Sequence, residues 1–188
     1  YNWSKMAADG YRWWLRRIAA GLDLFDAIRI DHFRGFESYW AVPGTARSAR
    51  AGTWCRGPAM DLFERILEAF PAAPIIAEDL GDIDDKVRRF LDQTGLPGMK
   101  VMQFAFNPAA GSTDRPHRFP RHCVAYSGTH DNTTLKAWLG QVDEPERRFI
   151  TDYCGAADCA AVLRCLWQSC ADRIIVPAQD LLDLGAAA

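Results

Sequence analysis

Three carboxylates stand at the ends of short apolar segments in this sequence of 188 residues: Asp31, Glu78 and Asp131. Carboxylates without cysteine or histidine at metal-binding spacing suggest two kinds of chemistry. Their oxygens can bind a hard cation such as Mg²⁺. Alternatively, one carboxylate attacks the anomeric carbon of a sugar while another donates a proton to the leaving oxygen.

An arginine accompanies the first of these acids, because Arg29 stands two residues before Asp31. Side chains two apart on a strand point to the same face. The guanidinium charge then favours the ionised carboxylate that a nucleophile needs. Glu78 instead ends the apolar run "PIIAE", and apolar surroundings favour the protonated form that a general acid needs.

Aromatic residues around the acids favour sugar chemistry over cation binding, because aromatic faces stack on the apolar faces of sugar rings. Most of these residues fit core packing at least as well. Trp40 and Trp54 lie on predicted loops beside the first acid, so we expect these two to contact sugar. We expect neither a metal ion nor a cofactor. The other aromatic residues are Trp3, Trp13, Trp14, Phe33, Phe36 and Tyr39.

Short apolar segments alternate with amphipathic ones, which predicts strands alternating with helices. The predicted strands cover residues 25–30, 73–80, 98–106, 122–131 and 173–178. Strand, helix and strand in this order form right-handed β-α-β units and a parallel sheet. Parallel α/β folds carry their sites at the carboxyl ends of the strands. We therefore expect Asp31, Glu78 and Asp131 to converge.

Helices are predicted between these strands, and one stretch is predicted to be a loop. Residues 43–57 are rich in Gly, Arg and Ser, which favours a loop over a strand. Three helices are predicted in the first half of the chain: one over about 11–22, one between Pro58 and Pro71, and one capped by Asp82 and ended by Gly95. Farther along, helical stretches are predicted over about 133–170, with breaks near Pro145 and Gly155. A short helix is predicted after residue 178.

Composition narrows the class of protein. Apolar residues make up 49% of the chain, enough for a core, and the net charge of −2 gives no reason to expect nucleic acid or a membrane surface as a partner. The six cysteines include no C-x-x-C pair, so we expect small buried side chains in a reducing cytoplasm rather than zinc ligands or disulfides.

Several long motifs occur together and in order. They are "RIDHFRGFESYWAVP", "IIAEDLG", "GMKVMQFAF" and "YSGTHDN". With these motifs the sequence resembles the 4-α-glucanotransferases, also called amylomaltases or disproportionating enzymes, which belong to the α-amylase-like clan of barrel enzymes. The resemblance implies an enzyme that transfers an α-1,4-glucan segment from a donor to an acceptor sugar with retention of configuration.

The resemblance also implies a role for each matching residue. Asp31 matches the nucleophile that forms a glycosyl ester, and Glu78 matches the general acid and base. Asp131 matches the acid that holds the 2- and 3-hydroxyls of the sugar. Arg29 matches the arginine beside the nucleophile, and His130 matches a histidine that contacts glucose in the donor subsite.

The same resemblance implies a parallel (β/α)₈ fold of the TIM-barrel type, of which about five strand–helix units are present. We expect residues 1–188 to be part of the catalytic domain of a longer enzyme, inactive alone, with exposed sheet edges that self-association could cover. The expected partners are maltooligosaccharides and α-1,4-glucans. Two alternatives remain: a retaining hydrolase or branching enzyme of the clan, and a non-catalytic glucan-binding fragment.

Overall fold

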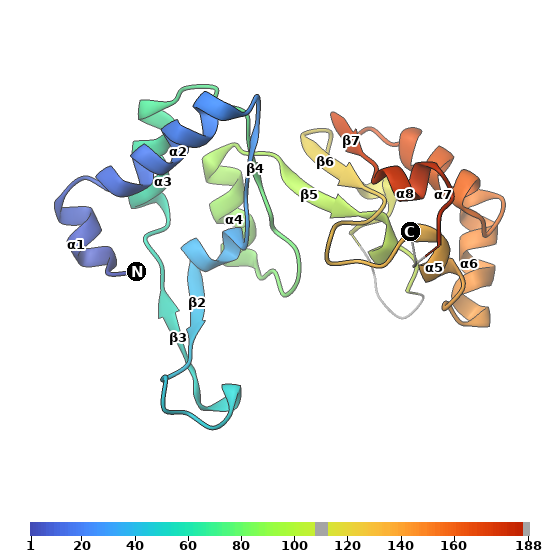
Figure 1. Ribbon diagram of the computed structural model, residues 1–188, viewed down its shortest axis with the longest axis horizontal. Helices are drawn as coiled ribbons and strands as arrows, with labels where there is room; N and C mark the ends of the chain where they lie inside the picture. Colours follow the sequence, from blue (N-terminus) through green and yellow to red (C-terminus); the bar gives the residue numbers. More distant parts are fainter. Residues whose placement is uncertain (108–112, 186–188) are drawn as a thin grey trace. The chain divides into compact units, whose positions relative to one another are not determined.

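The computed structural model describes residues 1–107 and 113–185, and the chain divides into two compact units, Tyr1–Gly98 and Met99–Ala188 (Figure 1). Each unit combines short strands with helices. Strand pairs β1–β4 and β6–β7 are parallel, which confirms the α/β class and the parallel pairing expected from the alternating pattern.

The first unit carries a parallel strand pair, an antiparallel hairpin and four α-helices. Its elements are α1 (Trp3–Ala8), α2 (Arg12–Leu24), β1 (Ile28–Ile30), η1 (Phe33–Phe36), β2 (Ser38–Ala41), η2 (Ala49–Ala51), β3 (Thr53–Arg56), α3 (Met60–Ala69), β4 (Ile75–Ala77) and α4 (Asp85–Thr94). In the parallel pair, Ile28 lies opposite Ile75 and Ile30 opposite Ala77. Strand β1 is shorter than the predicted 25–30, because its ladder extends no farther than the three residues of β4.

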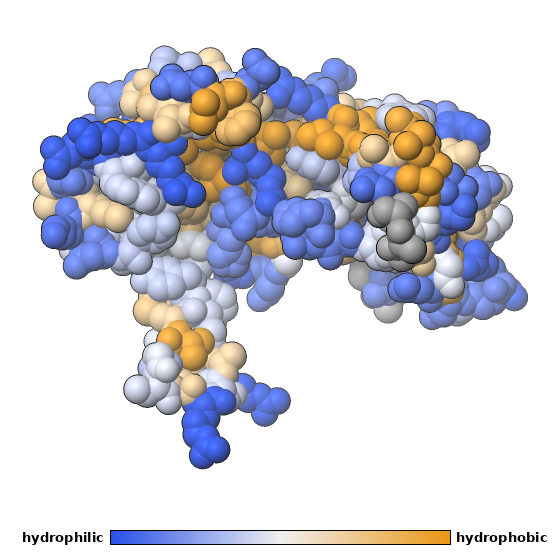
Figure 2. All heavy atoms as spheres, viewed as in Figure 1, coloured by the Kyte–Doolittle hydropathy of each residue, from blue (hydrophilic) through white to orange (hydrophobic). Residues whose placement is uncertain are grey.

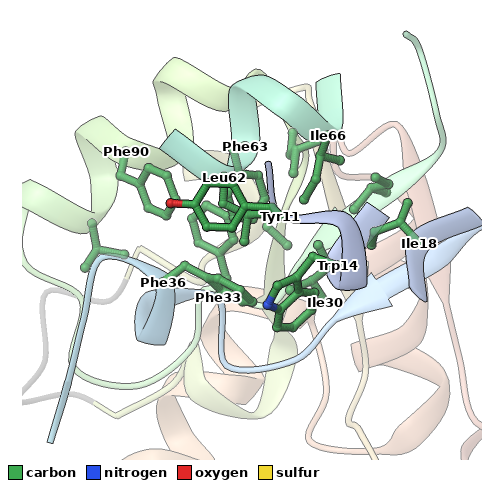
Figure 3. Packing of buried hydrophobic residues seen from close by; sticks show 14 residues of the cluster. Tyr11, Trp14, Ile18, Ile30, Phe33, Phe36, Leu62, Phe63, Ile66 and Phe90 are labelled. Atoms are coloured by element: carbon green, nitrogen blue, oxygen red, sulfur yellow. The ribbon is translucent and has the colours of Figure 1, made fainter. Parts of the chain in front are cut away.

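Aromatic and branched side chains from α2, η1, α3 and α4 form the core of the first unit (Figure 3). Phe33 and Phe63 are fully buried, and their rings meet edge to face with centroids 5.3 Å apart. Phe90 stacks on Phe33 with centroids 4.6 Å apart. These contacts fix η1 against α3 and α4, and η1 follows directly after Asp31 and His32.

Replacing Phe63 by alanine should lower the free energy of unfolding by about 3–5 kcal/mol, because the cavity left by a buried ring does not fully collapse. Denaturant unfolding of the chain measures this loss. Phe25→Ala is the control, since that side chain is 63% exposed and should change the stability by no more than about 0.5 kcal/mol. Equal losses for both variants would contradict the packing described for Phe63.

Helix α4 begins at a capping aspartate and ends at a glycine. The side chain of Asp84 caps α4 by accepting hydrogen bonds from the N–H groups of Lys86 and Val87, so the prediction that Asp82 is the cap is wrong by two residues. The Val87 N–H bond is the main reason that the pKa of Asp84 lies below its usual value. This stabilisation is present above the unfolded-state pKa and is lost as the pH falls through the lowered one. Gly95, with φ of 65°, ends α4 as predicted.

The prediction of a loop over 43–57 is wrong in part, because Thr53–Arg56 forms β3 and pairs antiparallel with β2. Trp40 lies opposite Trp54 in this hairpin. The strand is mostly exposed and packs across the hairpin rather than into a core, so it lacks the apolar alternation by which strands are recognised. In Figure 2 hydrophilic side chains, coloured blue, lie at the end of the hairpin farthest from the rest of this unit.

The second unit is built on the sheet β5-β6-β7. Its elements are β5 (Gly98–Val101, starting at the last residue of the first unit), η3 (Met102–Phe104), η4 (Pro116–Arg118), β6 (Cys123–Tyr126), α5 (Leu135–Leu139), α6 (Glu144–Cys154), α7 (Cys159–Trp167), β7 (Arg173–Ile175) and α8 (Ala178–Leu181). Within the described residues the parallel pairs β1–β4 and β6–β7 belong to different sheets, β1-β4 and β5-β6-β7, and not to the single sheet expected.

In the second unit one predicted strand is too long, whereas the predicted helix breaks are confirmed. The strand predicted over 98–106 stops at Val101, and the buried apolar residues that follow form the 3₁₀ turn η3 and the core. An apolar run alone does not distinguish a strand from a buried turn. The predicted breaks are confirmed: Pro145 lies in the first turn of α6, and Gly155, with φ of 89°, ends that helix.

The six cysteines are free thiols, but they are less uniformly buried than expected. Cys123 and Cys159 are buried, whereas Cys170 is exposed. In the described part of the chain, no group of three or more His, Cys, Asp or Glu residues is arranged to hold a metal ion. None of the described helices has both the length and the apolar character needed to cross a lipid bilayer.

Candidate active site

Asp31 follows the last residue of β1, and its carboxylate is paired with Arg29. Nη2 of Arg29 lies 2.6 Å from Oδ1 of Asp31, which confirms that the two side chains share a face. The Asp31 side chain is 73% exposed and the Arg29 side chain 28%. An ion pair this exposed adds little to stability. It presents an oriented, negatively charged oxygen to solvent at the carboxyl end of a strand.

Glu78 follows the last residue of β4, and main-chain donors hold both of its carboxylate oxygens. The N–H of His32 donates to Oε2 at 2.7 Å, and the N–H of Leu80 donates to Oε1 at 2.8 Å. The half-buried side chain therefore has polar partners, and the purely apolar surroundings expected from "PIIAE" are not found. Both oxygens of Glu78 thus act as hydrogen-bond acceptors for main-chain N–H groups.

Backbone hydrogen bonds continue the β1–β4 ladder into this pair of acids. The N–H of Glu78 donates to the carbonyl of Ile30, and the N–H of Phe33 donates to the carbonyl of Glu78, each at 2.9 Å. His32 adopts a left-handed conformation with φ of 48°, uncommon for a residue other than glycine or asparagine. This turn directs the His32 N–H at Glu78. Asp31 and Glu78 are thus fixed on neighbouring strand ends of the first unit.

Asp131 and His130 lie in the second unit, on the loop between β6 and α5. Nε2 of His130 is 3.5 Å from Oδ1 of Asp131, and both side chains are more than 70% exposed. Oδ1 of Asn132 accepts hydrogen bonds from the N–H and the hydroxyl of Thr129, each at 2.9 Å, which orders the loop. The convergence of Asp131 with the acids of the first unit stays a prediction.

Trp40 and Trp54 lie on strands β2 and β3, not on loops as expected. Their ring centroids are 5.4 Å apart and the rings meet nearly edge to face. Nε1 of Trp40 donates to the carbonyl of Ala49 at 2.7 Å. A Cβ at Gly52 would lie 2.3 Å from that Nε1, so the glycine permits the contact. Both indoles remain 42–54% exposed, which leaves aromatic surface for a ligand.

Arg34 connects this hairpin to the segment that follows Glu78, which the sequence reasoning did not foresee. Its guanidinium lies 4.5 Å from the ring centroid of Trp54. It also donates to the carbonyl of Asp82 and lies 3.8 and 3.9 Å from the carboxylates of Asp82 and Asp84. A charged side chain only 10% exposed needs such partners. The second arginine of "RIDHFRGF" was the available signal.

A cavity of about 620 Å³ adjoins β1 in the first unit. Asp31, Arg29 and His32 line one part of it, and Trp3 and Trp14 line another. The indole nitrogens of both tryptophans are buried without a hydrogen-bond partner among the described residues. The cavity therefore lies between the first predicted catalytic acid and the tryptophans of the first unit.

An aromatic side chain that the sequence reasoning missed follows β5. Phe104 is 45% exposed on η3, at the carboxyl end of that strand. The neighbouring Gln103 is buried, and its Nε2 donates to the carbonyl of Thr133 in the loop that carries Asp131. Phe104 is therefore a further candidate for stacking on a sugar ring. The motif "GMKVMQFAF" contained it, but the whole motif was assigned to a strand.

The fold and these strand ends define a parallel α/β protein with acidic residues at the carboxyl ends of its strands. The chain belongs to the 4-alpha-glucanotransferase family, whose sequence model matches residues 1–188. The resemblance read from the motifs is thereby confirmed.

Individual relatives agree with this family. The chain is 42% identical over 193 residues to a 4-alpha-glucanotransferase of Streptococcus pneumoniae, covering 100% of the chain and 38% of that protein. It is 42% identical over 192 residues to the chloroplastic/amyloplastic enzyme of Arabidopsis thaliana, covering 100% of the chain and 33% of that protein. An amylomaltase of Streptococcus agalactiae in complex with acarbose superposes with a TM-score of 0.94 at 37% identity, covering 99% of the chain and 39% of the amylomaltase. The chain thus spans about two fifths or less of the length of these relatives.

Proposed function

We propose that this chain carries the reacting carboxylates of a 4-alpha-glucanotransferase that moves α-1,4-glucan segments between maltooligosaccharides. The observation that supports this most is the pair of acids on neighbouring parallel strand ends, Asp31 oriented by Arg29 and Glu78 held by two main-chain N–H groups. Family membership supplies the substrate class. The relative solved with acarbose is consistent with that class.

The proposed reaction is a double displacement with retention. Asp31 attacks the anomeric carbon while Glu78 donates a proton to the departing glycosidic oxygen, which leaves a glycosyl ester on Asp31. Glu78 then takes the proton from the hydroxyl of an acceptor sugar, which attacks the ester. Asp131 binds the 2- and 3-hydroxyls of the donor sugar and His130 contacts the same sugar. Trp40 and Trp54 offer stacking surface. The mechanism uses no metal ion or cofactor.

We propose further that residues 1–188 are part of a (β/α)₈ catalytic domain of a longer cytoplasmic enzyme, with about five of its strand–helix units. The share of each relative that the chain covers supports this. So does the edge of β1 that faces away from β4, which has no partner strand among the described residues and adjoins the 620 Å³ cavity. A further strand at this edge would extend the sheet and cover the apolar lining of the cavity.

Incubation with maltotriose tests both proposals. The full-length protein that contains this chain should produce glucose together with longer maltodextrins, because one substrate molecule serves as donor and another as acceptor. The 188-residue chain alone should show little or no such product. Robust disproportionation by the isolated chain would contradict the fragment proposal, and self-association across the open edges would then be sought by light scattering.

The same assay separates the alternatives. Free reducing ends without longer products would identify a hydrolase, and α-1,6 branches would identify a branching enzyme. Glucan binding without turnover by the full-length protein, unchanged in Asp31→Asn and Glu78→Gln variants, would identify a non-catalytic binding protein. Any of these three results would replace the transferase assignment.

A further inference from the structure

A buried aspartate on α8 bridges two segments of the second unit. Asp180 is only 2% exposed. The hydroxyl of Ser127 donates to its Oδ2 at 2.6 Å, and the N–H of Leu135 donates to its Oδ1 at 2.7 Å. Ser127 and Leu135 are themselves fully buried, so solvent does not compete for either hydrogen bond.

These two partners flank the loop that carries the predicted sugar-binding acid. Ser127 is the first residue after β6, and Leu135 is the first residue of α5. Residues 128–134 lie between them and include His130 and Asp131. One carboxylate therefore holds both ends of this loop to a third element, α8.

The interior of the loop is ordered by other contacts. Asn132 accepts two hydrogen bonds from Thr129, and the carbonyl of Thr133 accepts one from Gln103. A Cβ at Gly128 would lie 2.8 Å from Nε2 of Gln103, so the loop passes close to the end of β5. With its interior fixed in this way, the position of the loop depends on how its two ends are anchored.

We propose that Asp180 is a positioning residue that sets where Asp131 and His130 stand for the donor sugar; this inference rests on the proposed glucanotransferase activity. A buried carboxylate is costly to desolvate and is not needed merely to fill space. Here each of the two carboxylate oxygens accepts a hydrogen bond from one end of the loop 128–134. A misplacement of about 1 Å in a group that contacts the substrate can lower the rate by about 10²-fold.

Three variants of the full-length protein test this. Asp180→Ala removes both anchors and should lower kcat/KM for maltotriose by about 10²-fold per folded molecule, through a higher KM as well as a lower kcat. Asp180→Asn should recover most of this loss. Its carbonyl oxygen can still accept from Leu135, and its amide can donate to the Ser127 oxygen. Ser127→Ala should fall between the two, because it removes one anchor.

Asp183→Ala is the matched control. This aspartate lies three residues after Asp180, and its carboxylate pairs with the Lys136 ammonium of α5 at 2.9 Å. The pair is exposed, and the hydrogen bonds described between Lys136 and Asp183 do not involve residues 128–134. Its kcat and KM should stay within about twofold of the parent values, as expected for an exposed ion pair. The folded fraction of each variant is measured by circular dichroism, so that unfolding is not counted as lost activity.

Hydrogen exchange separates this inference from the proposed function. Amide exchange over residues 128–135 of the full-length protein should be faster in Asp180→Ala and unchanged in Asp183→Ala, whether or not the protein transfers glucan. A parent protein without transferase activity would overturn the proposed function, and the exchange result would still decide the anchoring. Unchanged exchange over 128–135, or unchanged kcat and KM per folded Asp180→Ala molecule in an active enzyme, would overturn the inference.

Discussion

Replacing Asp31 by asparagine is expected to lower glucan transfer by the full-length enzyme by about four orders of magnitude or more, as removal of a covalent nucleophile does elsewhere. The amide has nearly the shape of the carboxylate but no negative charge with which to attack the anomeric carbon. Nη2 of Arg29, now 2.6 Å from Oδ1, would lose its anionic partner. Initial rates of glucose release from maltotriose measure the effect.

The stability of the Asp31→Asn variant should hardly change, because the Arg29–Asp31 pair is exposed and worth no more than about 1 kcal/mol. The activity loss can therefore be assigned to chemistry. Asp26→Asn is a suitable control, since Asp26 is an exposed acid just before the same strand. A loss of activity of less than about tenfold, far smaller than the loss expected on removal of a nucleophile, would show that Asp31 is not the nucleophile.

Glu78→Gln is expected to lower transfer from maltodextrin donors by about 10²–10⁴-fold, the usual contribution of a general acid. The loss should be much smaller for the first step with α-maltosyl fluoride, because fluoride leaves without a proton. Azide needs no general base, so added azide should restore turnover from this donor and yield α-maltosyl azide. The Asp31→Asn variant should yield no α-maltosyl azide, because it cannot form the glycosyl ester; direct displacement of fluoride by azide would give the β anomer.

The Glu78→Gln variant also has a structural cost. The N–H groups of His32 and Leu80 now donate to the two oxygens, and the amide nitrogen of glutamine cannot accept from either. Leaving the half-buried N–H of Leu80 unpaired costs about 1–3 kcal/mol, whereas water can replace the partner of the exposed His32 N–H, so the unfolding of the variant must be measured alongside its rates. Glu64→Gln, an exposed exchange on α3, controls for the loss of charge. Absence of azide rescue would argue against an acid–base role for Glu78.

The alternation of apolar segments was enough to predict the strands that Asp31 and Glu78 follow, and the shared face of Arg29 and Asp31 followed from strand geometry. The strand predicted over 122–131 is too long, because β6 ends at Tyr126 and Asp131 lies on the loop beyond it. The contacts of Glu78 with His32 could not be predicted, since they join residues 46 apart in the chain. Asp180 gave no signal either. In "AQDLL" it reads as a helix surface residue, and only the packing of α8 against Ser127 and Leu135 buries it.

The hairpin β2–β3 shows a second limit of sequence reasoning. Its strands pair with each other and present Trp40 and Trp54 to solvent, so no buried face imposes an apolar pattern on Thr53–Arg56. Arg34 was not singled out from the sequence, although its guanidinium packs on Trp54 and contacts Asp82. The roles of the seven residues singled out from the sequence stay predictions that the kinetic experiments decide.

The main-chain origin of the donors to Glu78 has a consequence for directed evolution of this protein. Any amino acid except proline supplies an N–H, so a saturation library at position 80 can vary the side chain beside the acid without removing its hydrogen bond. Position 32 is more constrained, because its left-handed backbone favours glycine, asparagine, aspartate and histidine. Variation at position 80 therefore changes the surroundings of Glu78 at little risk to its hydrogen bond, whereas variation at position 32 should be confined to those four residues.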